Sequence, residues 1–593
     1  MTEPGAETVE RRPRIAAVWR QHRARWTLPL VIIVIIGIVA IVDHLDSQRI
    51  SQVDDQKTSA LVPTTGGGTD VELDRPWAGF NPNTPAGAAS TSAALLSSVL
   101  PSAYTINPGP SPQVNSSLLL SVEATSTSPL TIQYVINPAA VWSDGVPVTA
   151  DDFIYAWQSQ RGDGVDVDGQ PDQVASTLGY RNIASVTSSH NGKTATVVFA
   201  TPFTDWRVLF HDMVPAHVAR RVGWNHGFDH FNRAVELSAG PFLLQSVSSN
   251  GSAVLVRNPK WWGTPAVMDR VTVNVGADQS SWVRALAVNN QTVAQPTDFD
   301  LGSLDAVSSL PNTQSFIKSS LNLMQLEFNV SSPATDKVAV RQAIAHAIDR
   351  TALLNRTFGS IDPSLVVNQD HLATASQPAY SASSAAGEYS TPDLATTDRL
   401  LRSIGYHQDP TGDYVDAAGK PLTLRMAVET GDPWISAVGE QISDQLRDAG
   451  IAVTTIPVAG VAGMVNASET DSYDMALVTR VTGPFQTATA AWFSLQGPVN
   501  SVGTLDWSTF DDPQVDQLFL QASEALNPVT GAAIYAQIDD QLWDQMVALP
   551  LFGEPGFEAN GVQMDNVQYN ASVEGILWNL PLWTGLKPGP PDQ

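Results

Sequence analysis

The first half of the chain after its amino-terminal segment is dominated by short apolar runs separated by turn signals. Several of these runs alternate or stay apolar over strand lengths: 116–122, 130–136, 183–187, 194–199 and 253–257. Asn191-Gly192 separates two of them, and this dipeptide favours the tight turn of a β-hairpin. We therefore expect residues 71–275 to be rich in β-strands.

Helical periodicity becomes prominent in the second half of the chain. Apolar positions recur at helical spacing in four stretches: 338–354, 395–404, 437–449 and 529–546. The third of these ends at Gly450, and an apolar strand-like run, 451–456, follows at once. Alternation of strands and helices in this way predicts an α/β unit with a partly parallel sheet.

An apolar run near the amino terminus, residues 28–42, is about 15 residues long, against about 20 for a usual membrane span. Trp26 and Leu45 can extend it at the interfaces, and no A-x-A-like cleavage site follows. Arginines precede it at positions 11, 12, 14, 20, 23 and 25. We expect an uncleaved transmembrane signal-anchor; a cleaved signal peptide is the alternative.

This reading divides the amino-terminal part into three segments. The basic head, 1–25, stays in the cytoplasm because positive charge marks the cytoplasmic flank of a span. The anchor covers 26–45, and the polar, glycine-containing stretch 46–70 is a flexible linker. The protein is therefore expected in the cell membrane, single-pass, with its large carboxyl-terminal part outside the cytoplasm.

Charge and composition narrow the classes of function. The formal net charge is −27, and the amino-terminal head is basic, so the exported part is more acidic still. Such a charge disfavours nucleic acid as a partner, because phosphates need a basic face. The chain contains no Cys, which excludes disulfides, thiolate metal sites, a cysteine nucleophile and a lipid attached to Cys.

Residues 142–153, Trp-Ser-Asp-Gly-Val-Pro-Val-Thr-Ala-Asp-Asp-Phe, combine a turn with a helix start. Asp144-Gly145 is a turn signal, and Thr149 is placed to cap a helix with two aspartates in its first turn. Other distinctive segments follow in order: 238–242 with 255–263, 327–329 with 340–350, 400–406 with 419–424 and 445–451, and 473–475 with 512–516 and 549–551. Together they resemble the peptide/nickel (oligopeptide-binding, family 5) type of extracellular solute-binding proteins of ABC importers.

The resemblance implies an α/β, two-lobed periplasmic-binding-protein-like fold that closes on its ligand by a hinge motion. The first lobe, with an extra subdomain, would cover 71–323 and receive the returning segment 551–593, whose tail is too Pro-rich to fold. The second lobe would cover 324–550, with crossings near 325–329 and 549–552. The family implies an ABC permease and its ATPase as partners, a monomer, no cofactor and no catalytic residue.

In peptide-binding relatives, loops of both lobes bind the main chain of an extended peptide. The matching loops carry the ligand-binding residues that we expect: Phe80, Asn81, Asn83, Arg480, Thr482, Gly483, Phe485 and Trp492. Those relatives also place an Asp in the second-lobe region to pair with the α-amino group of the peptide. This chain has no Asp or Glu between residues 475 and 505, and its one charge there is Arg480. An anionic or capped ligand would suit that arginine.

Three other readings stay open. His226 and His230, with His211 and His217 nearby, raise the question of metal capture, and haem-type ligands are known for the resembled fold. The Ser-x-x-Lys pattern at 315–318 occurs in penicillin-recognising enzymes, but the Lys-Thr-Gly that should follow is missing. A sensor with the same fold, not coupled to transport, is the third. The ligand stays open between a peptide, a capped or anionic peptide, haem, a metal complex and a sugar.

Overall fold

The computed structural model describes residues 61–73, 75–276, 278, 280–297, 299–494 and 506–588. The predicted basic head and membrane span lie outside these residues, as does most of the predicted linker. Among the residues described, no helix is long and apolar enough to cross a membrane. The chain divides into two units, Met1–Val62 with Pro588–Gln593 and Pro63–Lys587. The second unit carries every feature discussed below.

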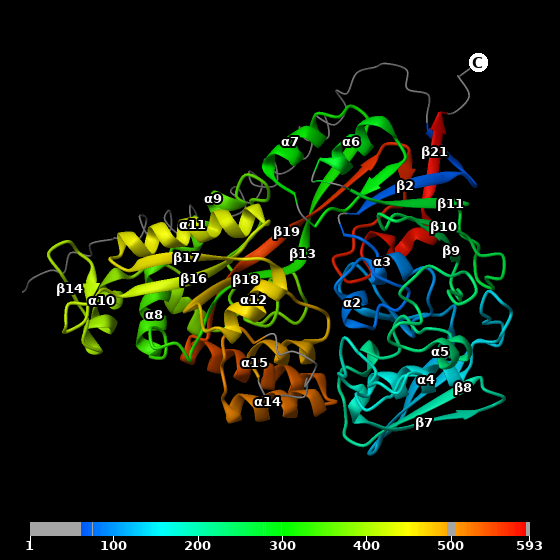
Figure 1. Ribbon diagram of the computed structural model, residues 1–593, viewed down its shortest axis with the longest axis horizontal. Coiled ribbons are helices and arrows are strands. Elements are labelled where there is room, and N and C mark those ends of the chain that lie inside the picture. The colour runs from blue at the N-terminus through cyan, green and yellow to red at the C-terminus, as the bar shows by residue number, and fades with distance from the viewer. Residues whose placement is uncertain are drawn as a thin grey trace, which may run out of the picture. The chain divides into compact units, whose positions relative to one another are not determined.

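A ten-stranded sheet, in the order β17-β16-β18-β13-β19-β12-β2-β11-β10-β9, runs through this unit. Its two longest strands, β13 (Thr313–Phe328) and β19 (Ala548–Gly561), pair antiparallel at its centre (Figure 1). One end of the pair joins Thr313 to Gly561 and the other joins Glu327 to Ala548. These two strands connect the two halves of the molecule, and the predicted crossings lie on them.

The second half of the sheet is the predicted α/β arrangement. Strand β16 (Thr423–Glu429) pairs in parallel with β17 (Ala452–Val458) and β18 (Met475–Val481). Helix α11 (Pro433–Asp448) connects β16 to β17 and ends before Gly450, whose φ of 84° is in the left-handed region that glycine tolerates. The predicted helix–stop–strand order is therefore confirmed.

The predicted helix 338–354 is wrong in one respect, because the structure has two helices there. Helix α8 (Val338–Ala347) ends where Ile348 becomes extended, and α9 (Arg350–Thr357) begins behind Asp349. The Asp349 side chain accepts a hydrogen bond from the main-chain N–H of Ala352, so it caps the second helix. The other helices of this lobe are α10 (Leu394–Ser403), α12 (Gly460–Glu469), α13 (Ala490–Phe493), α14 (Pro513–Glu524) and α15 (Pro528–Gln545).

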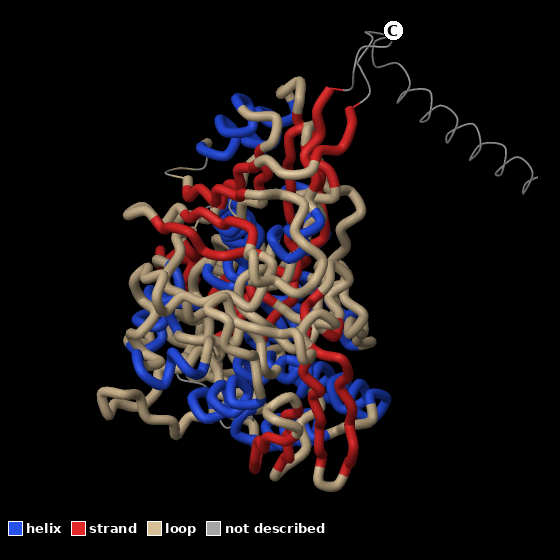
Figure 2. The backbone as a smooth tube through the Cα atoms, turned by 90° about the vertical axis from the view of Figure 1, so that its right-hand side faces the viewer, coloured by secondary structure: helices blue, strands red, loops and turns tan. Residues whose placement is uncertain are grey.

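The first lobe contains an extra subdomain built on a four-stranded sheet, β5-β6-β8-β7. Its strands are β5 (Leu119–Thr127), β6 (Leu130–Ile136), β7 (Ile183–Ser189) and β8 (Thr194–Phe199). The turn between the last two includes Asn191 and Gly192, both with positive φ, which confirms the predicted hairpin. Figure 2 looks onto this side of the molecule, where loops make up much of the surface.

Helix α4 (Ala150–Gln160) packs in the same subdomain and starts as the sequence predicts. The Thr149 hydroxyl accepts from the main-chain N–H of Asp151, and the Asp152 carboxylate accepts from the N–H of Thr149. The remaining helices of the first lobe are α2 (Pro85–Ala88), α3 (Ser92–Leu96), α5 (Ala216–Val222), α6 (Ser281–Val288) and α7 (Leu301–Ser308).

The first-lobe end of the large sheet starts earlier in the chain than predicted. Strand β2 (Gly68–Leu73) pairs in parallel with β11 (Arg270–Val275) and β12 (Thr292–Ala294), so the end of the predicted linker is a strand. Its glycines suggested flexibility, but pairing with distant strands orders the segment. The other strands are β1 (Leu61–Thr64), β3 (Tyr104–Ile106), β4 (Pro112–Val114), β9 (Phe242–Val247), β10 (Ala253–Arg257), β14 (His407–Gln408), β15 (Tyr414–Val415), β20 (Met564–Asp565) and β21 (Thr584–Pro588).

Separate hydrophobic cores confirm that there are two lobes. One cluster joins first-lobe residues from Val71 to Val293 with the returning segment, including Leu577 and Trp583. Another cluster consists of second-lobe residues from Met324 to Leu549, together with Leu551 and Phe552 at the crossing. Burial of apolar area is the main favourable term in folding, so each lobe has its own source of stability.

Candidate functional site

The predicted first-lobe loop is held firmly inside its own lobe. Phe80 is fully buried, its ring stacks on Phe228 at 6.2 Å, and its N–H donates to the Phe228 carbonyl oxygen. Asn81 is also buried, and its Nδ2 donates to the carbonyl oxygen of Trp224 at 3.3 Å. Both side chains therefore brace the loop, and their contact with a ligand stays a prediction.

Asn83 is more accessible than its two neighbours. Its side chain is half-buried, and its Nδ2 donates to the Asp212 carbonyl oxygen at 3.1 Å. Its own carbonyl oxygen accepts from the N–H of Ala175. The loop therefore ties several segments of the first lobe together, which gives it a defined shape before any ligand arrives.

Arg480 on β18 is a buried ion-pair partner within the second lobe. Its Nε and Nη2 donate to the two carboxylate oxygens of Glu327 on β13 at 2.6 and 2.7 Å. The guanidinium also lies over the rings of Trp492 and Trp507, at 5.6 and 5.7 Å from their centroids. The positive charge is thus already balanced by a carboxylate of the protein, and contact of Arg480 with a ligand stays a prediction.

The partner of Arg480 could not be found by inspecting the neighbouring sequence. Leu323 of β13 lies opposite Arg480, and Glu327 lies opposite Ala476 on the same antiparallel pair. Residues separated by an even number of positions share one face of a strand, so both side chains reach the same side of the sheet. Only the pairing of β13 with β18 reveals this contact.

An acidic side chain does lie beside this ion pair, just beyond the stretch without Asp or Glu. Asp506 is 4% exposed, and its Oδ1 accepts from the N–H of Ser508 at 2.9 Å. Burial raises its pKa to about 7, and the negative charge of Glu327 adds to the rise, while Arg480 opposes it. Its Oδ2 is buried and has no hydrogen-bond partner in the part of the chain described.

Gln325 adds a second unsatisfied acceptor to this group. The side chain is fully buried, and its Nε2 donates to Glu327 Oε1 at 2.9 Å. Its Oε1, like Asp506 Oδ2, is without a hydrogen-bond partner among the residues described. An unsatisfied buried acceptor costs free energy, so a group beside Arg480 that donates hydrogen bonds would be stabilised here.

The loop that follows β18 is anchored at its start and freer further on. The Thr482 hydroxyl and N–H both contact the Leu321 carbonyl oxygen, at 2.6 and 2.8 Å. The Gln377 side chain donates from Nε2 to the Gly483 carbonyl oxygen at 2.8 Å. Gly483 and Phe485 are half-buried, so of the predicted second-lobe residues they present the most surface.

Trp492 belongs to the packed wall behind this loop. It is 6% exposed and lies in a hydrophobic cluster with Phe493 and with residues of α14 and α15. Its ring meets that of Phe493 edge to face at a centroid distance of 6.4 Å. A ligand role for Trp492 stays a prediction, and its observed role is to cover Arg480.

A small cavity of about 170 Å³ lies at the crossing strands and includes Ser319, Ser320 and Glu554 in its lining. Glu554 accepts hydrogen bonds from Thr479 Oγ1 and from Asn322 Nδ2, at 2.5 and 3.0 Å. Burial raises its pKa to about 7, although the bond from Thr479 opposes the rise. The crossing therefore contains a buried carboxylate that ionises near neutral pH.

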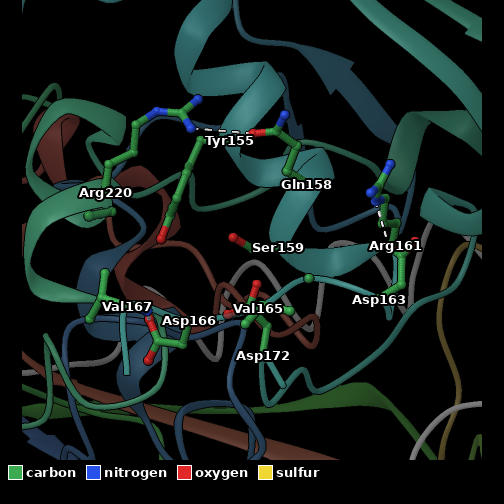
Figure 3. Close-up of a pocket in the computed structure, with 12 residues that line it drawn as sticks. Tyr155, Gln158, Ser159, Arg161, Asp163, Val165, Asp166, Val167, Asp172 and Arg220 are labelled. Carbon is green, nitrogen blue, oxygen red and sulfur yellow. Dashed lines mark hydrogen bonds and ion pairs between the residues drawn. The ribbon is translucent and has the colours of Figure 1, made fainter. Parts of the chain in front are cut away.

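A larger pocket, about 410 Å³, lies elsewhere, in the extra subdomain (Figure 3). It is built from α4, α5 and the connecting loop 161–172, with the Arg220 guanidinium 5.2 Å from the ring centroid of Tyr155. Burial and the neighbouring charge of Asp166 raise the pKa of Asp172 in this pocket to about 6. None of the predicted ligand residues lines it.

Three of the four histidines that raised the question of metal capture, at positions 211, 217 and 226, lie beside carboxylates. His226 Nδ1 lies 2.7 Å from Asp229 Oδ2, and His211 Nδ1 lies 3.0 Å from Asp212 Oδ2. Within the described ranges, there is no group of three or more His, Cys, Asp or Glu placed to hold a metal ion. These histidines thus act in local ion pairs.

The serine–lysine pattern also lacks the geometry of a nucleophile and its base. Ser315 and Lys318 are three residues apart on the strand β13. An odd separation on a strand places two side chains on opposite faces, whereas a base must lie within hydrogen-bond reach of its nucleophile. The pattern is therefore a chance match.

Two lobes with their own cores, joined by a pair of crossing strands, define a two-lobed binding protein. The model of the bacterial extracellular solute-binding proteins, family 5 Middle, matches residues 113–501. The chain belongs to this family, and it is accordingly an extracytoplasmic binding protein and not an enzyme.

Several curated relatives come from mycobacteria. A probable monoacyl phosphatidylinositol tetramannoside-binding protein of Mycobacterium tuberculosis is 28% identical over 412 residues, which cover 64% of this chain and 62% of that protein. The oligopeptide-binding protein OppA of the same organism is 28% identical over 482 residues, covering 78% and 76%. An uncharacterized lipoprotein, also of M. tuberculosis, is 26% identical over 552 residues, covering 87% and 92%.

Solved structures show the same fold at lower sequence identity. The periplasmic EDTA-binding protein EppA superposes with a TM-score of 0.81 at 24% identity, covering 89% of this chain and 98% of that one. The oligopeptide-binding protein AppA from Bacillus subtilis, solved with a nonapeptide, gives 0.70 at 16% identity, covering 89% and 100%.

Proposed function

We propose that this protein captures a peptide-like or other small organic solute between its two lobes and delivers it to an ABC permease. The observation that carries the proposal is the architecture: two cores linked by β13 and β19, with the predicted ligand loops at the ends of first-lobe and second-lobe elements. A pair of crossing strands permits a hinge motion that closes lobes on a ligand.

The chemistry beside Arg480 favours a ligand that donates hydrogen bonds. Glu327 already neutralises the guanidinium, while Asp506 Oδ2 and Gln325 Oε1 lack donors among the described residues. An ammonium or amide group of the ligand is the kind of donor that either acceptor lacks, so a peptide with a free amino group is the ligand class that we favour. One mycobacterial relative is named as an oligopeptide-binding protein, which supports the same class.

We further propose that the amino-terminal segment tethers the protein to the membrane. One relative is named a lipoprotein, yet the 593 residues of this chain contain no Cys that could carry a lipid. The arginine-flanked apolar run, residues 28–42, offers a different anchor, with the binding lobes outside the cytoplasm. Fractionation of host membranes, with and without residues 1–45, tests this anchor directly.

The experiment that tests the ligand class is native mass spectrometry of the protein purified from its own host. We expect a bound organic molecule with an amino or amide group. Asp506→Asn should weaken its retention about tenfold, because the charged acceptor is lost. Asp444→Asn, at an exposed position of α11, is the matched control. Retention of a metal ion without an organic ligand, or equal retention by Asp506→Asn, would contradict the proposed ligand chemistry.

A further inference from the structure

The two lobes also meet at a second place, away from the crossing strands. The turn after β8, with Thr204 and Asp205, belongs to the first lobe. It contacts the second lobe at the 3₁₀ helix η4 (Gln486–Thr489) and at the end of α14. No covalent connection holds the lobes together at this point, so the contact can open when the hinge moves.

Asp205 bonds to the second lobe through Thr487. Its Oδ2 accepts from the main-chain N–H of Thr487 at 3.1 Å and from the Thr487 hydroxyl at 2.5 Å. The same hydroxyl lies 3.2 Å from the phenol oxygen of Tyr535 on α15. A carboxylate that accepts two hydrogen bonds is a strong acceptor, and a main-chain N–H near the start of a helical turn has no partner within that turn.

Thr204 completes the other side of the contact. Its N–H donates to the Ser523 carbonyl oxygen at 2.7 Å, and its hydroxyl donates to the Ala525 carbonyl oxygen at 2.9 Å. These carbonyls belong to the last turn and the cap of α14, where the helix itself supplies no donor. Leu526, the next residue, packs against the hydrophobic core of the first lobe.

The contact thus provides hydrogen-bond partners for main-chain groups at the start of η4 and at the end of α14. These helices do not pair those groups internally. Water can replace each of these hydrogen bonds when the lobes separate, so the exchange is nearly balanced in free energy. The apolar contact of Leu526 and the charged acceptor Asp205 favour the closed side of that balance. Such a contact is well suited to a reversible closure.

Its position in the chain links it to the ligand loop. Thr487 lies two residues after Phe485 and four after Gly483, the half-buried residues of the predicted second-lobe site. We infer that Asp205, Thr204 and Thr487, with the end of α14, form a latch whose engagement sets the open–closed balance. This role rests on the proposed function. A ligand bound at residues 483–485 would order the segment that carries Thr487. Asp205 and Thr487 would then act as positioning residues that hold the lobes in the closed arrangement.

The absence of Cys from the chain makes a direct test possible. Spin labels on Ser188→Cys of β7 and Gln521→Cys of α14, both at exposed positions, report the distance between the lobes by pulsed electron paramagnetic resonance. In the ligand-free protein we expect a short-distance population. Asp205→Ala or Thr487→Val should each reduce the ratio of short to long distances about tenfold.

A double-mutant cycle separates the latch from local damage. The double variant Asp205→Ala/Thr487→Val should shift the distance distribution no further than either single variant, because both remove the same contact. Thr201→Val is the control, since its hydroxyl accepts only from Asn182 within the first lobe. Unchanged distances in both single variants, additive shifts in the double variant, or an equal shift in the control would overturn the latch.

This experiment needs no ligand, so a failure of the latch can be told apart from a failure of the proposed function. A closed population that depends on Asp205 and Thr487, in a protein from which no organic ligand is recovered, would contradict only the proposed function. If a ligand is recovered from protein purified from the host, but neither substitution changes the interlobe distances, only the latch is contradicted.

Discussion

The crossing strands and the latch are two of the places where the lobes meet, and they are built in different ways. At the crossing, β13 and β19 share a ladder of main-chain pairs from Thr313–Gly561 to Glu327–Ala548. Beside it lie the Glu327–Arg480 ion pair and the buried Glu554. At the latch, the contacts are side-chain and cap hydrogen bonds of Thr204 and Asp205, supported by the apolar contact of Leu526.

This difference suggests that the crossing stabilises the folded protein, whereas the latch controls the distance between the lobes. Contacts at the crossing are buried and continuous with both cores, so their loss should destabilise the folded protein. Contacts at the latch join surfaces that can each be hydrated, so their loss should change the distance between the lobes and leave folding almost unaffected. The following predictions test these two roles, in order of decreasing effect on the free energy of unfolding.

The largest effect is expected at the ion pair of the crossing. Glu327→Gln leaves the Arg480 guanidinium buried without its counter-charge, which should lower the free energy of unfolding by about 3 kcal/mol. Urea denaturation at pH 8, followed by circular dichroism, measures the change. Glu558→Gln on the neighbouring strand β19 is the control, because burial raises the pKa of Glu558 to about 7 and no arginine pairs with it. A loss as large in the control would refute the ion-pair argument.

An intermediate effect, dependent on pH, is expected at Glu554. Its pKa of about 7 in the folded protein lies above the usual 4.5, so the folded state binds the proton more tightly than the unfolded state. The resulting stabilisation is complete below pH 4.5 and is lost as pH rises through 7. Between pH 5 and pH 8, wild-type protein should lose about 2 kcal/mol of stability that Glu554→Gln does not lose.

The difference between the two denaturation profiles across this pH range isolates the contribution of Glu554. Glu469→Gln, at an exposed position of α12, should keep the wild-type pH dependence. Parallel profiles for wild type and Glu554→Gln would show that this carboxylate is not the titrating group at the crossing.

The smallest effect on folding is expected at the latch. Thr487→Val should change the free energy of unfolding by less than about 1 kcal/mol, because water replaces the lost hydrogen bond. Small-angle X-ray scattering of the same variant should nevertheless show a larger radius of gyration than wild type. A stability loss comparable to that of Glu327→Gln would mean that the latch is part of the folding core.

Local features were predictable because their causes lie within a few residues. Thr149 and Asp152 form a capping box three positions apart, and Asn191-Gly192 directs a hairpin turn without help from elsewhere. The stop of α11 before Gly450 likewise depends on one residue that accepts a positive φ. The family motifs are mostly such local features, which is why the two-lobed fold could be recognised.

The candidate site was predicted less well, because its chemistry depends on distant segments. Arg480 looked like a free cation until β13 brought Glu327 beside it, 153 positions away in the chain. Asp506 lies one residue beyond the stretch searched for a carboxylate, and only its burial near Glu327 and Arg480 gives it significance. Phe80 stacks on Phe228, a contact between positions 148 residues apart that the sequence did not indicate, and its contact with a ligand stays a prediction.

The sequence by itself determined the family, the two lobes, the acidic character and the arginine-flanked apolar segment. These follow from local signals and composition, which need no knowledge of contacts between distant residues. Tertiary structure alone decided which charges are neutralised, where buried acceptors lack donors, and that Asp205 meets Thr487 across 282 positions of chain. Such pairings depend on how the strands are ordered in the sheet. The hydrophobic periodicity of the sequence does not determine that order.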